Sequence, residues 1–444
     1  MKTNIQLDHE PVADGGWLVR ALLRIEGQPR TDENRVPLNV SVVLDRSGSM
    51  GGEKIQAAKE AARSLVRGLA PEDTVSVVAF DTHVETLADP ATGDEQQDLI
   101  PLIDAIYAGS ATNLSGGWLK GREHVDAHRR KGAVNRVLLM TDGQANQGIT
   151  DAAKLSGICR SAAENGVTTT TIGFGEGFRE QLLQAMADAG GGATYYIEET
   201  DQAHGVFEEE LEGLLSVCAQ NLAVQLRPTQ GNECVQVWHG YPSEAEEDLL
   251  TLTIGDLYAR EPRLVLVEFL LKPAEDGKEE EEVEVATFTV TADVVTPEGD
   301  VEKHTVTLPV MLSPVEGGYV NPEVRKELLH QEAARTRKEA LEDWERGDIG
   351  AADLKLRSMS ARMMSAPYAD DELREVGRDL RMVARQADRH GVSERERKYM
   401  TQREYDAGRS KKKASERVSR ARRAEEEERR RAKEEKRRRE RGRD

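Results

Sequence analysis

The sequence has few cysteines, few aromatic residues and no long apolar run. Its 444 residues include three cysteines, and aromatic residues make up 4% of the chain. The spacing of Cys159, Cys218 and Cys234 matches no zinc motif and gives no disulfide framework, so we expect buried, reduced thiols. The strongest apolar run, from Leu264 to Leu271, is interrupted by Glu268 and is too short to cross a bilayer.

The amino-terminal residues, Met1 to Gln6, do not have the pattern of a signal peptide. We therefore expect a cytoplasmic protein with no membrane span. Hydrophobic residues make up 38% of the chain and charged residues 32%, which is typical of a globular core combined with long solvated helices. The length predicts two to four domains.

Charge is distributed unevenly along the chain. Residues 409–444 contain 18 Lys and Arg against nine Asp and Glu, so this tail carries about nine positive charges. The net charge is -20, which leaves about -29 on the remainder. An acidic body with a basic tail suggests self-association or an acidic partner. Pairs such as Glu425–Arg429 and Glu434–Arg438, each worth about 0.2–0.5 kcal/mol, favour a solvated helix in the tail.

The most informative segment is Asp45-Arg46-Ser47-Gly48-Ser49, which follows the apolar run 38–44. It presents a carboxylate and two hydroxyls at the carboxyl end of a predicted buried strand. Oxygen ligands at alternate positions suit a hard divalent cation such as Mg²⁺. Open α/β sheets bind their ligands in the crevice beyond these strand ends.

Two further segments are predicted to reach the same crevice. Thr112 lies in a Gly-rich loop before a predicted helix, and Asp142 follows the apolar run 137–140. Taken alone, the pentapeptide also suits a helix N-cap, and Asp142-Gly143 also suits a simple turn. Because the three segments occur in order in an alternating β/α pattern, we favour a single metal site. Its predicted members are Asp45, Ser47, Ser49, Thr112 and Asp142.

This constellation resembles the von Willebrand factor A (vWA) domain and its metal-ion-dependent adhesion site. The similarity covers about residues 37–217, and all five positions of the family pattern match. The resemblance implies that Ser47, Ser49 and Thr112 contact Mg²⁺ directly or through water, with Mn²⁺ or Ca²⁺ as alternatives. Asp45 and Asp142 would act largely through water and hydrogen bonds. It also implies a mostly parallel sheet wrapped by helices, with one short antiparallel edge strand.

The pattern along the chain predicts a doubly wound α/β domain inserted in a β-sandwich and followed by helices. The bacterial intracellular vWA proteins of the calcium-activated chloride channel regulator-like type look similar, although we expect no channel activity. The expected regions are N-terminal sandwich strands at 1–36, the vWA domain at 37–217, the β-sandwich at 218–316, a helical region at 317–408 and a charged helical or disordered tail at 409–444.

Individual elements follow from periodicity. In the vWA region we expect strands at 38–44, 74–80, 82–87, 134–141, 167–172 and 193–197, and helices at 53–69, 96–107, 117–129, 151–165, 178–189 and 201–217. The sandwich strands are expected at 221–227, 235–239, 249–254, 263–272, 283–292 and 305–312, and later helices at 324–347, 349–364 and 371–390. His124 and His128 are spaced for a zinc pair, but we favour an exposed helix face.

The favoured function is a cytosolic Mg²⁺-dependent protein-interaction module that binds an Asp or Glu of a partner or of a neighbouring copy. The resemblance suggests an adaptor of an AAA+ ATPase or of a multi-protein complex. One alternative is a self-assembling ring or filament. Another, nucleic-acid binding through the tail, is disfavoured by its interleaved glutamates. A phosphohydrolase attacking through Asp45 would need a second Asp where Ser47 stands, and no catalytic base is evident, so we expect no enzyme.

Overall fold

The computed structural model describes residues 1–444 with the exception of 14, 29–35, 131, 144, 176–179, 198–209, 212, 260, 273–281, 296–300, 391 and 410–444. The chain divides into two compact units, Met1–Leu328 and Leu329–Asp444. The expected tail, with its predicted Glu–Arg pairs, lies almost wholly outside the described residues. No helix in the described parts of the chain is long and apolar enough to cross a membrane.

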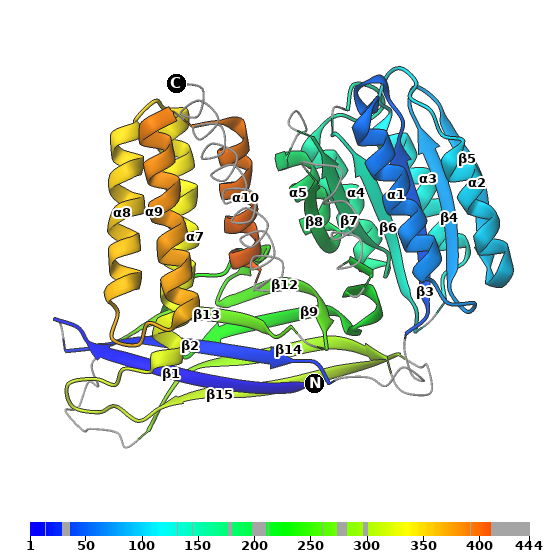
Figure 1. Ribbon diagram of the computed structural model, residues 1–444. Coiled ribbons are helices and arrows are strands. Elements are labelled where there is room, and N and C mark those ends of the chain that lie inside the picture. Colours follow the sequence, from blue (N-terminus) through cyan, green and yellow to red (C-terminus); the bar gives the residue numbers. More distant parts are fainter. Residues whose placement is uncertain are drawn as a thin grey trace, which may run out of the picture. The chain divides into compact units, whose positions relative to one another are not determined.

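The first unit contains a six-stranded sheet with the order β5-β4-β3-β6-β7-β8 (Figure 1). Five strands run parallel, and β5 at the edge runs antiparallel to β4, as expected. The central strands are buried along their whole length, which is typical of a parallel sheet covered on both faces. The strands are β3 (Leu38–Asp45), β4 (Thr74–Phe80), β5 (Val84–Thr92), β6 (Val134–Thr141), β7 (Thr168–Phe174) and β8 (Gly191–Ile197).

Helices cover both faces of this sheet, so the predicted doubly wound α/β class is confirmed. Val42 of β3 packs in a core with α1 and α2, whereas its neighbour Val43 packs in a second core with α3, α4 and α5. This alternation follows from the two-residue period of a strand. The helices are α1 (Glu53–Gly68), α2 (Leu99–Asp104), α3 (Leu114–Ala127), α4 (Ala152–Glu164) and α5 (Glu180–Ala189).

Two predicted helices differ from the structure. The single helix expected at 96–107 is a 3₁₀ segment, Gly93–Asp98, followed by the short α2, which leaves residues 105–113 as a loop. The helix expected at 117–129 begins three residues earlier because the Asn113 side chain caps it by accepting a hydrogen bond from the Gly116 backbone N–H. Of the helix expected at 201–217, residues 201–209 lie outside the described part of the chain.

Two antiparallel sheets are built from strands that lie before and after the α/β sheet in the sequence. They share one hydrophobic core. One has the order β1-β2-β13-β10 and the other β11-β12-β9-β14-β15. Leu23, Phe269 and Phe288 belong to their common core, so the N-terminal strands complete a sandwich as expected. The strands are β1 (Lys2–Pro11), β2 (Trp17–Glu26), β9 (Val217–Pro228), β10 (Glu233–Val237), β11 (Ser243–Glu246), β12 (Leu249–Tyr258), β13 (Arg263–Leu271), β14 (Val283–Val295) and β15 (Val301–Leu312). The short, exposed β11 was not predicted.

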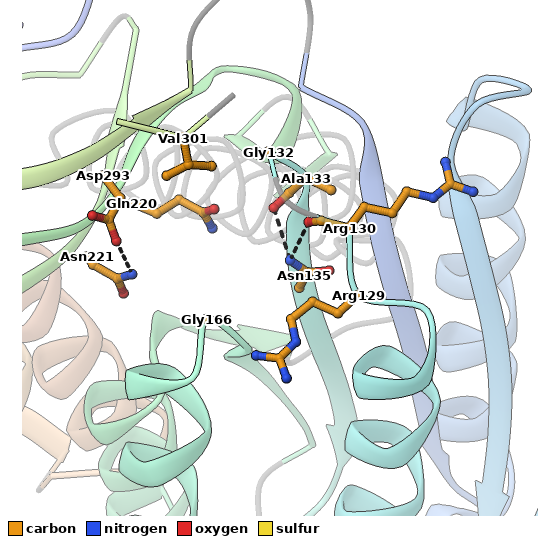
Figure 2. A pocket seen from close by; sticks show the side chains of 10 residues that line it. All are labelled: Arg129, Arg130, Gly132, Ala133, Asn135, Gly166, Gln220, Asn221, Asp293 and Val301. Carbon is orange, nitrogen blue, oxygen red and sulfur yellow. Dashed lines mark hydrogen bonds between the residues drawn. The ribbon is translucent and has the colours of Figure 1, made fainter. Parts of the chain in front are cut away.

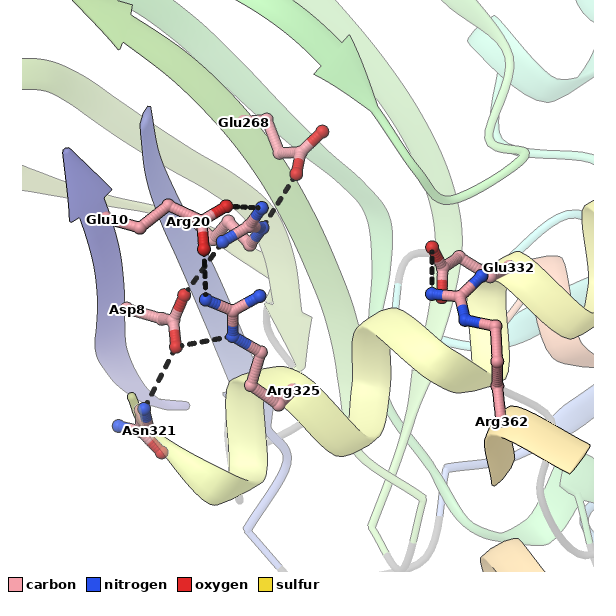
Figure 3. Close-up of polar contacts among 8 residues, drawn as sticks. All are labelled: Asp8, Glu10, Arg20, Glu268, Asn321, Arg325, Glu332 and Arg362. Carbon is pink, nitrogen blue, oxygen red and sulfur yellow. Dashed lines mark hydrogen bonds and ion pairs between the residues drawn. The ribbon is translucent and has the colours of Figure 1, made fainter. Parts of the chain in front are cut away.

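The glutamate that interrupts the apolar run of β13 belongs to a buried ion network (Figure 3). Arg20 of β2 pairs with Glu268 at 2.7 Å and with Asp8 of β1 at 3.0 Å. Asp8 also accepts a hydrogen bond at 2.8 Å from Arg325, at the start of α7 (Pro322–Glu345). Burial of these charges is tolerated because each is paired and hydrogen-bonded. The network therefore joins three strands and one helix of the first unit.

The second unit is built from α7 beyond Leu328, α8 (Ile349–Ser365), α9 (Asp371–His390) and α10 (Glu394–Gly408), which share one apolar core. The three predicted helices are present. The fourth, α10, was missed, although its start carries a readable signal. Ser393 and Glu396 form a capping box in which each side chain accepts a hydrogen bond from the other residue's backbone N–H.

Candidate metal centre

Asp45 is the last residue of β3, in the middle of the six-stranded sheet, and its side chain is buried. Its Oδ1 accepts a hydrogen bond at 2.8 Å from the backbone N–H of Ser47, which folds the chain back after the strand. Its Oδ2 accepts another at 2.5 Å from the hydroxyl of Thr141 on the neighbouring β6. The carboxylate is therefore held between the ends of two parallel strands.

The two serines follow directly. The Oγ atoms of Ser47 and Ser49 lie 3.2 Å apart, with Ser47 buried and Ser49 exposed. The alternative that this segment caps a helix is wrong. Helix α1 begins after Gly52 with no side-chain cap, and Ser47 precedes only a short 3₁₀ turn without capping it. The polar side chains of the pentapeptide are therefore available to the crevice.

Asp142 follows β6, and its side chain is fully buried. Gly143 has a positive φ of 70°, and its N–H donates to the Thr141 hydroxyl at 2.9 Å, so the chain turns sharply here. The chain therefore does turn at Asp142-Gly143, as the alternative interpretation expected. The turn is compatible with the metal site because it leaves the Asp142 carboxylate beside Asp45. Asp142 adds to the rise in the pKa of Asp45 through its negative charge.

Thr112 is brought to this place by backbone hydrogen bonds of its loop. The Ser110 carbonyl accepts from the Gly48 N–H at 2.8 Å, which ties the loop to the serine segment. The Thr112 carbonyl accepts from the Asn146 N–H at 3.2 Å, which ties it to the segment after Asp142. The structure thus gathers all five predicted residues in three adjoining loops at the carboxyl edge of the sheet.

Sequence reasoning missed one member of this cluster. Lys54, in the first turn of α1, places its Nζ 3.2 Å from Oδ2 of Asp142. A Cβ atom at Gly175 would lie 2.4 Å from the Lys54 Cε, so the glycine-rich turn after β7 borders this ammonium group. No short-range pattern identifies such a lysine, because its partner lies 88 residues away.

The donor set fits a hard divalent cation. Oδ1 of Asp142 is buried, and among the described residues it has no hydrogen-bond partner. Burial raises the pKa of Asp45 to about 6, against the hydrogen bonds from Thr141 and Ser47, which lower it. Two buried carboxylates with neighbouring hydroxyls form a site in which a cation would offset both desolvation and mutual repulsion. Ser47, Ser49 and Thr112 would hold it, with Asp45 and Asp142 close behind.

The two histidines that are spaced for a zinc pair, His124 and His128, lie in and directly after α3. His128 is exposed as expected, but the exposed setting predicted for His124 is wrong. Its side chain is buried, and its Nε2 lies 3.3 Å from the Thr86 hydroxyl of β5. Burial lowers the pKa of His124. Within the described residues no cluster of three His, Cys, Asp or Glu side chains suits a metal, which gives no support to a zinc pair.

The cysteines follow the prediction in part. Cys159 and Cys218 are buried, Cys234 is only half-buried, and none of these three described cysteines forms a disulfide. Burial raises the pKa of the Cys159 thiol to about 12, so this group remains protonated at neutral pH.

A cavity of about 370 Å³ lies away from the metal centre (Figure 2). Ala133 and Asn135, at the start of β6, line one side, and Gln220 and Asp293 of the sandwich line the other. Asp142 follows the opposite end of the same strand, roughly 20 Å away at 3.3 Å per residue. The Arg130 side chain is directed elsewhere and donates to the Glu72 carbonyl at 3.0 Å.

Comparison with known proteins assigns the α/β region. Residues 39–209 match the family model of the von Willebrand factor type A domain. The chain is 27% identical over 211 residues to the uncharacterized protein YfbK of Escherichia coli, covering 47% of this chain and 37% of that protein. It is 29% identical over 210 residues to the uncharacterized protein sll0103 of Synechocystis, covering 46% and 49%. It is 28% identical over 246 residues to the E3 ubiquitin-protein ligase WAV3 of Arabidopsis thaliana, covering 53% and 31%.

The chain spans less than half the length of these relatives. A solved structure of similar fold, a von Willebrand factor type A protein from Catenulispora acidiphila, covers 90% of this chain and 95% of its own. Its TM-score is 0.69 at 16% sequence identity, so the likeness concerns the fold. Together the family match and the doubly wound sheet assign residues 39–209 of this chain to the von Willebrand factor type A domain.

Proposed function

We propose that the chain is a Mg²⁺-dependent protein-interaction module that binds an Asp or Glu side chain of a partner protein. The observation that carries this proposal is the buried Oδ1 of Asp142, which has no hydrogen-bond partner among the described residues. Its negative charge acts on Asp45, whose own segment supplies the hydroxyls of Ser47 and Ser49. An anionic oxygen in that position is costly unless a cation or a donor meets it. A metal held at Ser47, Ser49 and Thr112 meets that need.

The chemistry of this donor set favours binding. Hydroxyl ligands are neutral, so a divalent cation held mainly by them keeps much of its charge and attracts a further anionic oxygen. Ser49 is exposed, whereas Asp45 and Asp142 are buried. Ser47 and Thr112 are buried as well, so the site opens to solvent at Ser49, and a partner carboxylate can approach from there.

The spread of the domain among relatives is consistent with a module. The similarity covers only part of each relative, and one of them is named a ubiquitin ligase. A region that recurs inside proteins of different lengths fits a shared binding role. For this chain we propose a cytoplasmic setting, as an adaptor of an AAA+ ATPase or of a multi-protein complex, on the strength of the sequence resemblance.

Hydrolysis of a phosphate ester is the competing chemistry. Lys54 lies beside Asp142, so a phosphate ester would meet an ammonium group there. Against this reaction, Ser47 occupies the position where a second Asp would be needed. We propose that the protein does not catalyse this reaction. Turnover of p-nitrophenyl phosphate that requires Mg²⁺ and is lost in Asp45→Asn would contradict the proposal.

The metal site is tested by titrating the whole protein with Mg²⁺ in a calorimeter. Ser49→Ala removes an exposed hydroxyl that lies 3.2 Å from the Ser47 hydroxyl, so the fold should be unaffected. We expect its affinity for Mg²⁺ to fall by at least roughly tenfold. The matched control is Ser365→Ala, an exposed serine on α8, which should bind Mg²⁺ like the wild type. Equal affinities in all three proteins would contradict the site.

Partner binding is tested by cross-linking and affinity capture from the source cells. Proteins captured by the wild type in Mg²⁺, but not by Ser49→Ala or in EDTA, are the expected partners. Capture that is identical in all three conditions would refute a metal-dependent interaction. Sedimentation in Mg²⁺ and in EDTA separates the self-assembly alternative, because a carboxylate supplied by a neighbouring copy predicts a Mg²⁺-dependent oligomer.

A further inference from the structure

Four arginines form a stripe along the exposed face of α9 in the second unit. Arg374, Arg378, Arg381 and Arg385 are all exposed. They are spaced by four, three and four residues, so their side chains lie on one side of the helix. At 1.5 Å per residue they extend over about 16 Å. We call these four residues the arginine stripe.

The charge of the arginine stripe is poorly neutralised by the chain itself. Arg374 lies 3.7 Å from Asp371, which is fully exposed, and a pair in such a position contributes little. Within the described part of the chain, no ion pair joins Arg378, Arg381 or Arg385 to an acidic side chain. The net charge of the chain is -20, so the stripe is a local exception to its overall balance.

The neighbouring face of α8 is neutral and partly apolar. Ser360 of α8 donates to the Gly377 carbonyl of α9 at 2.6 Å, and a Cβ atom at Gly377 would lie 3.0 Å from Met364 Cγ, so the two helices pack closely (Figure 1). Outside this contact α8 exposes Leu354 and, two turns later on the same side, Ala361. An apolar strip on α8 thus runs beside the basic strip on α9.

The acidic side chains that border this face are engaged or turned away from it. Asp353 of α8 accepts a hydrogen bond from Arg357, one turn later, at 2.7 Å. Glu372 lies 3.7 Å from His330 of α7, and Glu375, three residues later, is half-buried on the same side of α9. The exposed side of α8 and α9 therefore remains positive.

We propose that this face binds an acidic amphipathic helix of a partner protein. Carboxylates at positions i, i+4, i+7 and i+11 of that helix repeat the spacing of the arginine stripe. Apolar side chains beside them pack on Leu354 and Met364 of α8. A guanidinium group can meet a carboxylate through two parallel hydrogen bonds, which suits arginine to this role. The interaction uses the second unit and does not depend on the metal centre.

Exposure and charge favour an acidic helix over other occupants. Leu354 and Met364 are 70% and 41% exposed, and a nucleic acid would lay phosphates against them without an apolar contact. The net charge of -20 also opposes the approach of a duplex, which carries one negative charge about every 1.7 Å. A second copy docked by the same face would bring two arginine stripes together, so like charges oppose that contact.

The test is a selection of helices on the full-length protein in EDTA, which keeps the metal centre out of the comparison. The probe is a phage-displayed library of alanine-rich helices of about twenty residues, randomised along one face. We expect the selected helices to carry Asp or Glu at the spacing of the arginine stripe, with apolar residues beside them.

One selected peptide is then titrated by fluorescence anisotropy. Arg378→Glu combined with Arg381→Glu, the double variant, should weaken binding at least roughly tenfold, and Leu354→Ser roughly threefold. Arg335→Glu, at an exposed arginine of α7, is the matched control and should bind within about twofold of the wild type. With its acidic residues changed to lysine, the peptide should bind the double variant more tightly than the wild type.

The remaining outcomes overturn the proposal. They are a selection that yields no acidic helices, and a selected peptide that binds the double variant like the wild type, as it would on the basic tail. Duplex DNA or phosphatidylserine vesicles that bind more tightly than the peptide, and lose binding in the double variant, would assign the stripe to that anion instead. The substituted side chains are all exposed, and circular dichroism of each variant checks that it is folded.

Discussion

Replacing Arg136 by methionine is expected to destabilise the first unit strongly. Arg136 lies in β6, and its side chain has no exposure to solvent. Its guanidinium group contacts Asp256 of β12, lies 3.2 Å from Glu210 Oε1, and donates to the Thr168 hydroxyl at 2.9 Å. Burial by itself lowers the pKa of Arg136, but Asp256 and Glu210 raise it above its ordinary value, so the group is charged.

The magnitude follows from the partners that remain. Without Arg136, two carboxylates that are about 1% exposed stay in the interior and lose the cation that contacts both of them. The nearby Arg263 donates to the backbone carbonyl of Asp256. Removing one partner of a buried ion pair costs about 3–5 kcal/mol. At about 2 °C per kcal/mol, the value for the larger domains surveyed, this lowers the melting temperature of the first unit by roughly 6–10 °C.

The assay is differential scanning calorimetry of the whole protein, with an exposed ion pair as the control. Arg160 of α4 pairs with Glu244 of β11 at 2.8 Å, with side chains 55% and 72% exposed. It joins the same two parts of the first unit, but an exposed pair contributes only about 0–1 kcal/mol, so Arg160→Met should shift the transition by less than about 2 °C.

A triple variant identifies the cause. Arg136→Met combined with Glu210→Gln and Asp256→Asn removes the charges of Arg136 and of both its acidic partners together, and we expect it to recover part of the lost stability. If Arg136→Met and Arg160→Met shift the transition equally, the reasoning about buried charge is refuted.

Three further predictions concern the α/β region. The Asp73 carboxylate accepts hydrogen bonds from the backbone N–H groups of Leu38 at 2.9 Å and Ala70 at 2.8 Å. Asp73→Ala leaves both groups without this acceptor, so the free energy of unfolding measured in urea should fall by about 1–3 kcal/mol. An unchanged free energy of unfolding would contradict this role. Gly121→Ala places a Cβ atom 2.3 Å from Val43 Cγ2 where α3 crosses β3, so it should cost about 1–3 kcal/mol in the same assay; an unchanged midpoint would show that α3 can shift freely. Lys54→Met removes an ammonium group that competes for Asp142 and should strengthen Mg²⁺ binding by roughly threefold to tenfold in calorimetric titration, whereas weaker binding would mean that the lysine supports the site.

Much of the fold could be read from local patterns. Short segments rich in apolar residues, separated by amphipathic helices, predicted the buried strands β3, β4 and β6 at nearly their observed bounds. Predictions from weaker sequence patterns were wrong or missing at two places. Residues 105–107 carry a helical pattern but lie in a loop, and the site needs that loop because it brings Thr112 to the segments of Gly48 and Asn146. The start of α10 was readable from its capping box but lies in a highly charged stretch.

The sequence by itself determined the five oxygen-bearing residues and their gathering at one edge of the sheet. Parallel strands end on the same side, so the strand pattern alone locates a residue that follows a buried strand. The tertiary structure alone decided which distant charges meet. Lys54 reaches Asp142 across 88 residues, Arg136 reaches Asp256 across 120, and Arg20 reaches Glu268 across 248. Such pairings depend on which strands become neighbours, and that order comes from packing the whole chain rather than from any local period.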